Sequence, residues 1–162
     1  MLHFDGSSQE KDFDTNMTLQ VALKGKDGFV IASDKKASSG STTEKIFMER
    51  DFLCAVSGES TVSRVGRKLL AQLPQLPEEE TLQWLEQQAE QFLIASSVPP
   101  HRRASLAASL IFAAPYWSAS LQVIFDSGIV SCQKTNPAFG GDIRNPALIF
   151  FSEILLIREK RR

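Results

Sequence analysis

The chain has 162 residues, of which 43% are apolar, and its formal net charge at pH 7 is -1. This length and apolar content predict one globular domain with a core of its own and exclude a largely disordered chain. A charge this close to zero provides no field that would gather nucleic acid or an anionic membrane surface. No apolar run approaches the roughly 20 residues of a membrane helix. Residues 1–16 are polar and acidic, unlike a secretory signal, so we expect a cytoplasmic protein.

The elements expected in the first half are a flexible leader and two hairpins. Residues 1–16 show neither helical nor strand periodicity. Apolar and polar residues then alternate, which predicts a strand with one buried face, and an Asp-Gly pair turns the chain into a second strand. A charged turn at residues 49–51 separates two further strands. The predicted strands of this half cover residues 18–24, 29–33, 45–48 and 52–57.

Two helices and a second group of strands are expected next. Apolar residues fall at helical spacing from Val62 to Leu73, and Pro74 closes that helix. The second helix opens at Pro77, before three glutamates that suit the helix dipole, and the prolines at 99–100 break it. Strand patterns return at residues 105–113, 118–125 and 129–132. This order predicts antiparallel α+β architecture, with either one sheet under a helix layer or two stacked sheets covered by helices.

Cysteine and histidine offer no metal or triad chemistry. Cys54 and Cys132 lie inside apolar runs without metal-ligand spacing, which predicts small buried side chains in a reducing compartment. The histidines are His3 and His101, and neither has neighbours that would build a zinc site or a serine or cysteine triad. No phosphate-binding glycine loop is present. The sequence therefore predicts neither a metal nor a cofactor, and no nucleic-acid or membrane partner.

Residue identity adds a resemblance to a known family. Residues 18–40 open with Thr-Leu-Gln-Val-Ala-Leu, residues 44–46 read Glu-Lys-Ile, and residues 55–58 read Ala-Val-Ser-Gly. With a threonine, an aspartate, a lysine and a glycine in one register, this stretch resembles the catalytic half of a proteasome β-type subunit. The resemblance covers residues 18 to about 150. It implies the N-terminal nucleophile hydrolase fold, a four-layer αββα sandwich of two antiparallel sheets between helix layers.

The resemblance also implies an active site. Thr18 would be the nucleophile and would have to become the first residue of the mature chain, so that its own amine can act as the base. Lys45 would lie beside the Thr18 hydroxyl and lower its pKa, Asp34 would pair with Lys45, and the amide of Gly58 would face the oxyanion. The implied reaction is peptide-bond hydrolysis through a threonyl acyl ester. The implied assembly is a homo-oligomeric ring, with α-type subunits and an unfolding ATPase as further partners.

The same resemblance places a substrate pocket. Its walls and floor map onto Ala37, Ser38, Thr43 and Val56, and a valine at the floor would favour modest apolar side chains. Lys36 stands where the family carries a basic residue near the site, although a surface charge explains it nearly as well. Taken singly, the candidate threonine, aspartate and lysine also fit ordinary strand and surface positions.

Three departures keep other interpretations open. Met17 stands where self-cleaving members have glycine, which argues against autolytic removal of residues 1–17 as the propeptide of a zymogen. If translation instead begins at Met17, removal of that methionine would expose Thr18, and residues 1–16 would be an artefact of start-site choice. Residues 139–142 read Phe-Gly-Gly-Asp where the family has a glycine-serine-glycine turn. The family's later elements have no counterpart beyond Ala147, so residues 18–162 are predicted to form a C-terminally shortened domain. A non-catalytic ring or scaffold subunit, an inactive truncated homologue and a small-molecule amidase remain alternatives.

Overall fold

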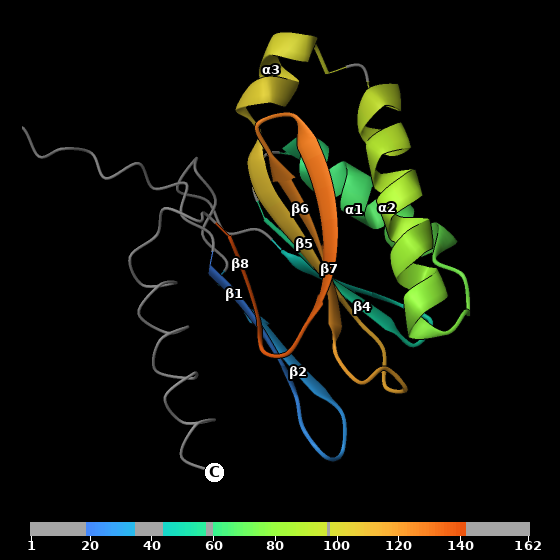
Figure 1. Cartoon of the computed structure of the whole chain (residues 1–162). Helices are drawn as coiled ribbons and strands as arrows, with labels where there is room; N and C mark the ends of the chain where they lie inside the picture. Colours follow the sequence, from blue (N-terminus) through green and yellow to red (C-terminus); the bar gives the residue numbers. More distant parts are fainter. Residues whose placement is uncertain (1–18, 35–43, 58–59, 97, 142–162) are drawn as a thin grey trace, which may run out of the picture.

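A computed structural model of the chain describes residues 19–34, 44–57, 60–96 and 98–141 (Figure 1). Strands come first, helices follow, and strands close the described part, as the sequence predicts. The elements are β1 (Leu19–Lys24), β2 (Phe29–Ser33), β3 (Ile46–Glu49), β4 (Phe52–Val56), α1 (Ser60–Gln72), α2 (Glu78–Ala95), α3 (Pro100–Ser105), β5 (Ala107–Ala113), β6 (Ser120–Asp126), β7 (Ile129–Thr135) and β8 (Ala138–Gly141).

The strands form two antiparallel sheets rather than one. The smaller sheet has the order β2-β1-β8, and the larger has the order β3-β4-β5-β6-β7. The two predicted hairpins are confirmed, because β1 pairs with β2 and β3 with β4, and the strands predicted on either side of residues 126–128 form a further hairpin, β6 with β7. At the last of these turns Ser127 and Gly128 both have positive φ, the geometry that an Asp-Ser-Gly sequence favours. The α+β class with two antiparallel sheets is therefore confirmed.

The larger sheet lies between the helices and the smaller sheet (Figure 1). Strand β5 shows both contacts, because its side chains alternate between the two faces. Leu110 and Phe112 point into the main core beneath α1 and α2, whereas Ile111 points into a second core between the sheets. The second core is built mostly from alanines, which allow the sheets to pack closely; its buried members are Ala22, Ala55, Ile111 and Ala138.

Helix α1 lies close to the larger sheet because it carries a glycine on its inner face. A Cβ atom at Gly66 would lie 2.8 Å from Leu110 Cδ2 and 2.9 Å from Val56 Cγ1, distances that real Cβ atoms do not adopt. Val62, Val65, Leu69 and Leu70 complete that face and are all buried. The helical spacing of apolar residues in the sequence therefore predicted the buried side of α1 correctly.

Three local predictions differ from the structure. The short helix α3 lies just before the predicted strand, which begins at Ala107 rather than residue 105. Residues 138–141 form strand β8 against β1, whereas no strand was predicted after residue 132. In β1 the buried face carries Gln20 and Ala22, while the apolar residues Leu19 and Val21 are half-buried. Contacts between distant segments determine these features, so the local periodicity of the sequence could not predict them.

Candidate functional site

Asp34 and Lys45, the predicted acid and cation, form an ion pair at the start of β1. Lys45 Nζ lies 3.1 Å from Asp34 Oδ1. The same carboxylate oxygen accepts the backbone N–H of Leu19 at 3.1 Å, and the backbone N–H of Asp34 donates to the Leu19 carbonyl at 3.1 Å. Leu19 directly follows Thr18 in the chain. Asp34 therefore fixes the lysine to the strand that begins beside the predicted nucleophile.

Lys45 is the buried member of this ion pair. The Lys45 side chain is 8% exposed and the Asp34 side chain is 31% exposed. Lysine is rarely buried without a partner, because removing an ammonium group from water is costly. The backbone holds Lys45 as well, since the Val56 N–H donates to the Lys45 carbonyl at 2.8 Å. The lysine is thus positioned by the end of β2, where Asp34 follows, and by the end of β4.

Ser57 is held by a hydrogen-bond cluster that the sequence did not predict. The Ser57 N–H and the Ser57 hydroxyl both donate to the Ser109 carbonyl, at 3.1 Å and 3.0 Å. In return the Ser109 N–H donates to Ser57 Oγ at 2.9 Å. Both serines are buried. Ser57 directly precedes Gly58. This cluster therefore fixes the backbone immediately before the predicted oxyanion donor.

The cluster reaches β1 through a buried glutamine. The Ser109 hydroxyl donates to Gln20 Oε1 at 3.4 Å, and Gln20 lies opposite Gly140 in the pairing of β1 with β8. A Cβ atom at Gly140 would lie 2.5 Å from both Gln20 Oε1 and Ser109 Oγ. A glycine is therefore required at this point of β8. The result is a polar network between the sheets that connects the start of β1 with the end of β4.

Several predicted site residues lie outside the described residues. They include the nucleophile and the oxyanion donor, together with most of the pocket and the nearby basic residue: Thr18, Gly58, Ala37, Ser38, Thr43 and Lys36. Val56 is the described member of the predicted pocket, and it is buried in the core beneath α1. Among the residues described, the structure therefore brings Asp34 and Lys45 together and places Val56 two residues before Gly58.

The two cysteines are not activated nucleophiles. Burial raises the pKa of the Cys54 thiol far above its usual range. Burial, with a smaller contribution from the nearby Glu86 carboxylate, raises the pKa of Cys132 to about 12. Both thiols therefore stay protonated at neutral pH, and the thiolate is the reactive form.

The described part of the chain contains neither a cluster of metal-ligating side chains nor a helix suited to crossing a membrane. No group of three or more His, Cys, Asp or Glu side chains is placed to hold a metal ion there. None of the helices there combines the length and the apolar character that crossing a membrane requires.

The chain was also compared with known proteins. No protein-family model matches it, and no curated protein matches it. The resemblance of residues 18 onward to proteasome subunits therefore stays a prediction. The candidate site rests on the geometry of Asp34, Lys45 and the Ser57–Ser109 cluster.

Proposed function

We propose that the protein is a threonine peptidase subunit of a cytoplasmic, proteasome-like ring, and that its complete fold is the four-layer αββα sandwich. The observation that carries the proposal is the 3.1 Å ion pair of Lys45 and Asp34, whose carboxylate also binds the backbone of Leu19. This ion pair holds a buried cation close to the residue that follows Thr18. Such a cation would favour the deprotonated, nucleophilic form of the Thr18 hydroxyl.

In the proposed reaction Thr18 Oγ attacks the carbonyl carbon of a peptide bond. The free α-amine of Thr18 takes the hydroxyl proton and passes it to the leaving amine as the C–N bond breaks. Water then hydrolyses the acyl ester and regenerates the hydroxyl. Lys45 stabilises the nucleophile by its positive charge, and the Gly58 amide stabilises the oxyanion. A preorganised donor of that kind lowers the barrier by about 3 to 4 kcal/mol.

The Ser57–Ser109 cluster supports the same proposal. Oxyanion donors contribute most when their position is fixed before the reaction, because no reorganisation is then needed. Ser57 is held by three hydrogen bonds to Ser109, which leaves the backbone immediately before Gly58 little freedom. This buried cluster would act as the support of the oxyanion donor.

The alternative is a ring or scaffold subunit without activity, or an inactive truncated homologue. One observation favours it. Strand β8 presents Gly140 and Gly141 to β1, so the serine that supports the nucleophile in the resembled family is absent from this strand. Such a subunit would use the same sheets for assembly and would hydrolyse nothing.

The test compares the full chain with its Thr18→Ala variant on short fluorogenic peptides, with the N-terminus of each preparation determined by intact mass. We expect turnover in the preparation whose mass corresponds to a chain starting at Thr18, and none in Thr18→Ala. A ring-sized assembly that starts at Thr18 and hydrolyses no peptide favours the scaffold. Turnover of simple amides without turnover of peptides favours an amidase.

A further inference from the structure

Helices α1 and α2 have opposite charge. Helix α1 carries Arg64, Arg67 and Lys68 and no acidic residue, as its sequence STVSRVGRKLLAQ shows. Helix α2, EEETLQWLEQQAEQFLIA, carries five glutamates and no basic residue. The two helices pack side by side on the same face of the larger sheet. The helix layer therefore carries a positive strip along α1, whose Arg67 reaches Phe47 of β3, and a negative strip along α2, whose Glu78 and Glu79 reach Lys134 of β7.

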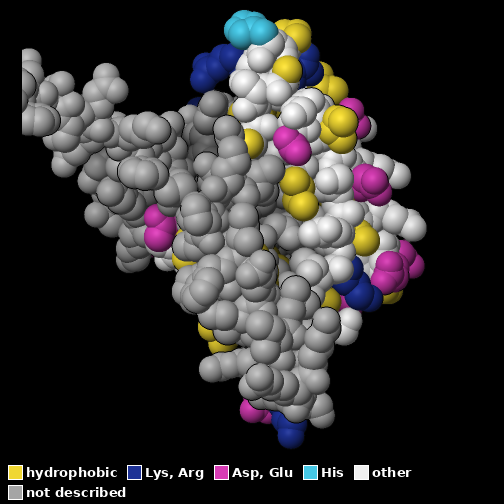
Figure 2. All heavy atoms as spheres, turned by 60° about the vertical axis from the view of Figure 1, so that its left-hand side comes forward, with side chains coloured by type: hydrophobic (Ala, Val, Ile, Leu, Met, Phe, Trp, Pro, Cys, Tyr) yellow, Lys and Arg dark blue, Asp and Glu magenta, His cyan; other side chains and the backbone are white. Residues whose placement is uncertain are grey.

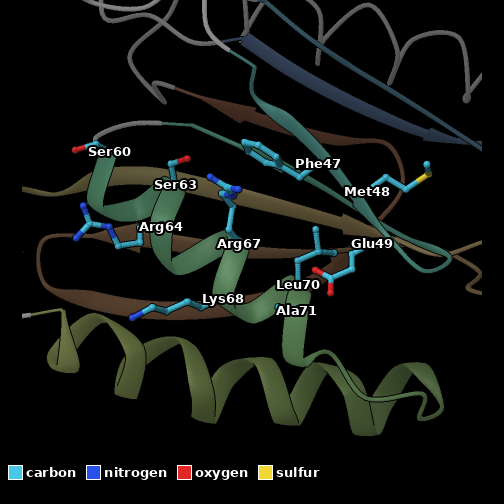
Figure 3. Close-up of a pocket in the computed structure, with 10 residues that line it drawn as sticks. All are labelled: Phe47, Met48, Glu49, Ser60, Ser63, Arg64, Arg67, Lys68, Leu70 and Ala71. Carbon is cyan, nitrogen blue, oxygen red and sulfur yellow. The ribbon is translucent and has the colours of Figure 1, made fainter.

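The positive strip lines a groove between α1 and β3, with a volume of about 540 Å³ (Figure 3). Arg67 extends over the Phe47 ring, with its guanidinium carbon 4.9 Å from the ring centroid. Met48 is 75% exposed at the same groove, and Glu49 is its one acidic lining residue among those described. On the face drawn in Figure 2, by contrast, the coloured hydrophobic side chains are scattered among polar ones. The groove thus combines exposed apolar surface with a strong positive charge.

No ion pair between the described residues joins α1 to α2. The ion pairs recorded for α2 run instead from Glu78 and Glu79 to Lys134 on β7. Arg64 and Lys68 stand four residues apart on α1, as Glu86 and Glu90 do on α2, and like charges at that spacing destabilise a helix. All four side chains are exposed. An oppositely charged surface would relieve both repulsions.

We propose that this helix face is a docking surface for a second copy of the chain, with α1 of one protomer against α2 of its partner. A two-fold axis through the face would form both contacts at once, because each protomer supplies one positive and one negative strip. The second copy is the occupant that the charges favour, since the complement of each strip is present on the same surface. The proposal uses neither Asp34 nor Lys45 and does not depend on peptidase activity.

Charge-swap complementation tests the proposal. Sedimentation equilibrium of the full chain should show self-association that weakens as salt rises, because exposed charges are screened. Arg64→Glu with Lys68→Glu makes the face predominantly acidic, with Arg67 as the remaining basic residue of α1, and Glu86→Lys with Glu90→Lys makes it predominantly basic. Each double variant alone should associate at least about tenfold more weakly. An equimolar mixture of the two should recover association, because each strip again meets its opposite.

A matched control carries the same change of charge elsewhere. Lys26→Glu with Arg103→Glu alters net charge as much as the α1 variant does, at the β1–β2 turn and on α3, and should associate like the unmodified chain. Circular dichroism melting checks that every variant folds. If a charge reversal prevents folding, the neutral pairs Arg64→Gln with Lys68→Gln and Glu86→Gln with Glu90→Gln replace the reversals, and each should still weaken association.

Four results would overturn the proposal. The first is an unmodified chain that stays monomeric at low salt. The second is association that neither the α1 variant nor the α2 variant weakens. The third is a mixture of the reversed variants that stays dissociated. The fourth is a monomeric chain that binds polyglutamate at the α1 groove, which would assign the groove to an acidic partner other than a second copy.

Discussion

Ser57→Ala is the substitution that probes the buried cluster most selectively. It removes one hydroxyl group, which donates to the Ser109 carbonyl at 3.0 Å and accepts the Ser109 N–H at 2.9 Å. The Ser109 carbonyl keeps a partner, since the Ser57 N–H still donates to it at 3.1 Å. The Ser109 N–H loses the hydroxyl oxygen that accepts its hydrogen bond. The variant therefore removes two of the hydrogen bonds that join Ser57 to Ser109.

The expected loss of stability follows from these two hydrogen bonds. A neutral hydrogen bond contributes about 0.5 to 1.5 kcal/mol. We expect the free energy of unfolding to fall by about 1 to 3 kcal/mol in Ser57→Ala. Ser105→Ala is the control, because its hydroxyl donates to the Arg102 carbonyl at 2.9 Å in an exposed position. That variant should change stability by less than about 0.5 kcal/mol.

Urea unfolding followed by circular dichroism measures both variants. The midpoint concentration should fall in Ser57→Ala while the dependence on urea concentration stays constant, since the same surface is exposed on unfolding. A Ser57→Ala variant as stable as Ser105→Ala would refute the buried cluster as the support of the segment before Gly58.

Three further predictions concern other parts of the fold. Gly140→Ala should lower the free energy of unfolding by about 1 to 3 kcal/mol in a thermal melt, because its Cβ meets two buried oxygens, whereas Gly25→Ala has ordinary contacts at 3.7 Å and should have little effect. Burial raises the pKa of Glu78, but hydrogen bonds from Ser118 and Lys134 outweigh this and hold it below 4.5. Its carboxylate therefore stabilises the fold above that pH, and this contribution disappears as the pH falls through the folded value. Glu78→Gln should be less stable by under about 1 kcal/mol at pH 7 and equal to the parent chain in acid, as pH-dependent urea titrations would show. Burial raises the pKa of Cys132 to about 12, so its thiol should react with iodoacetamide at pH 8 on the order of a thousandfold more slowly in the folded chain than in the unfolded chain. Equal rates in the two states would contradict its burial.

The predicted hairpins were correct because turn chemistry is local. The turns that end at Gly28 and Gly128 need positive φ at glycine, and the residues around them specify that geometry within a few positions. Strand β8 could not be predicted in this way. Residues 138–141 read Ala-Phe-Gly-Gly and lack a strand pattern, and they become a strand because they pair with β1. Their pairing partner lies more than one hundred residues away in the chain.

The candidate site likewise has a part that the sequence predicted and a part that it did not. The Asp34–Lys45 pair was predicted, because the register of the family resemblance placed an acid and a lysine together. The cluster of Ser57, Ser109 and Gln20 was not predicted, because polar residues in an alternating strand are normally assigned to the solvent face. Here the polar face of β1 packs against the larger sheet, so Gln20 is fully buried. A long-range contact between sheets reversed the expected orientation of that strand.

The central claim is that the Asp34–Lys45 pair activates Thr18. The most direct measurement is kcat/KM for a fluorogenic peptide, compared between chains that start at Thr18 with Lys45 intact and with Lys45→Met. We expect a loss of at least about a hundredfold, since the substitution removes the buried cation that is proposed to activate Thr18 and keeps the volume of the side chain. A Lys45→Met enzyme as active as the parent chain would contradict it.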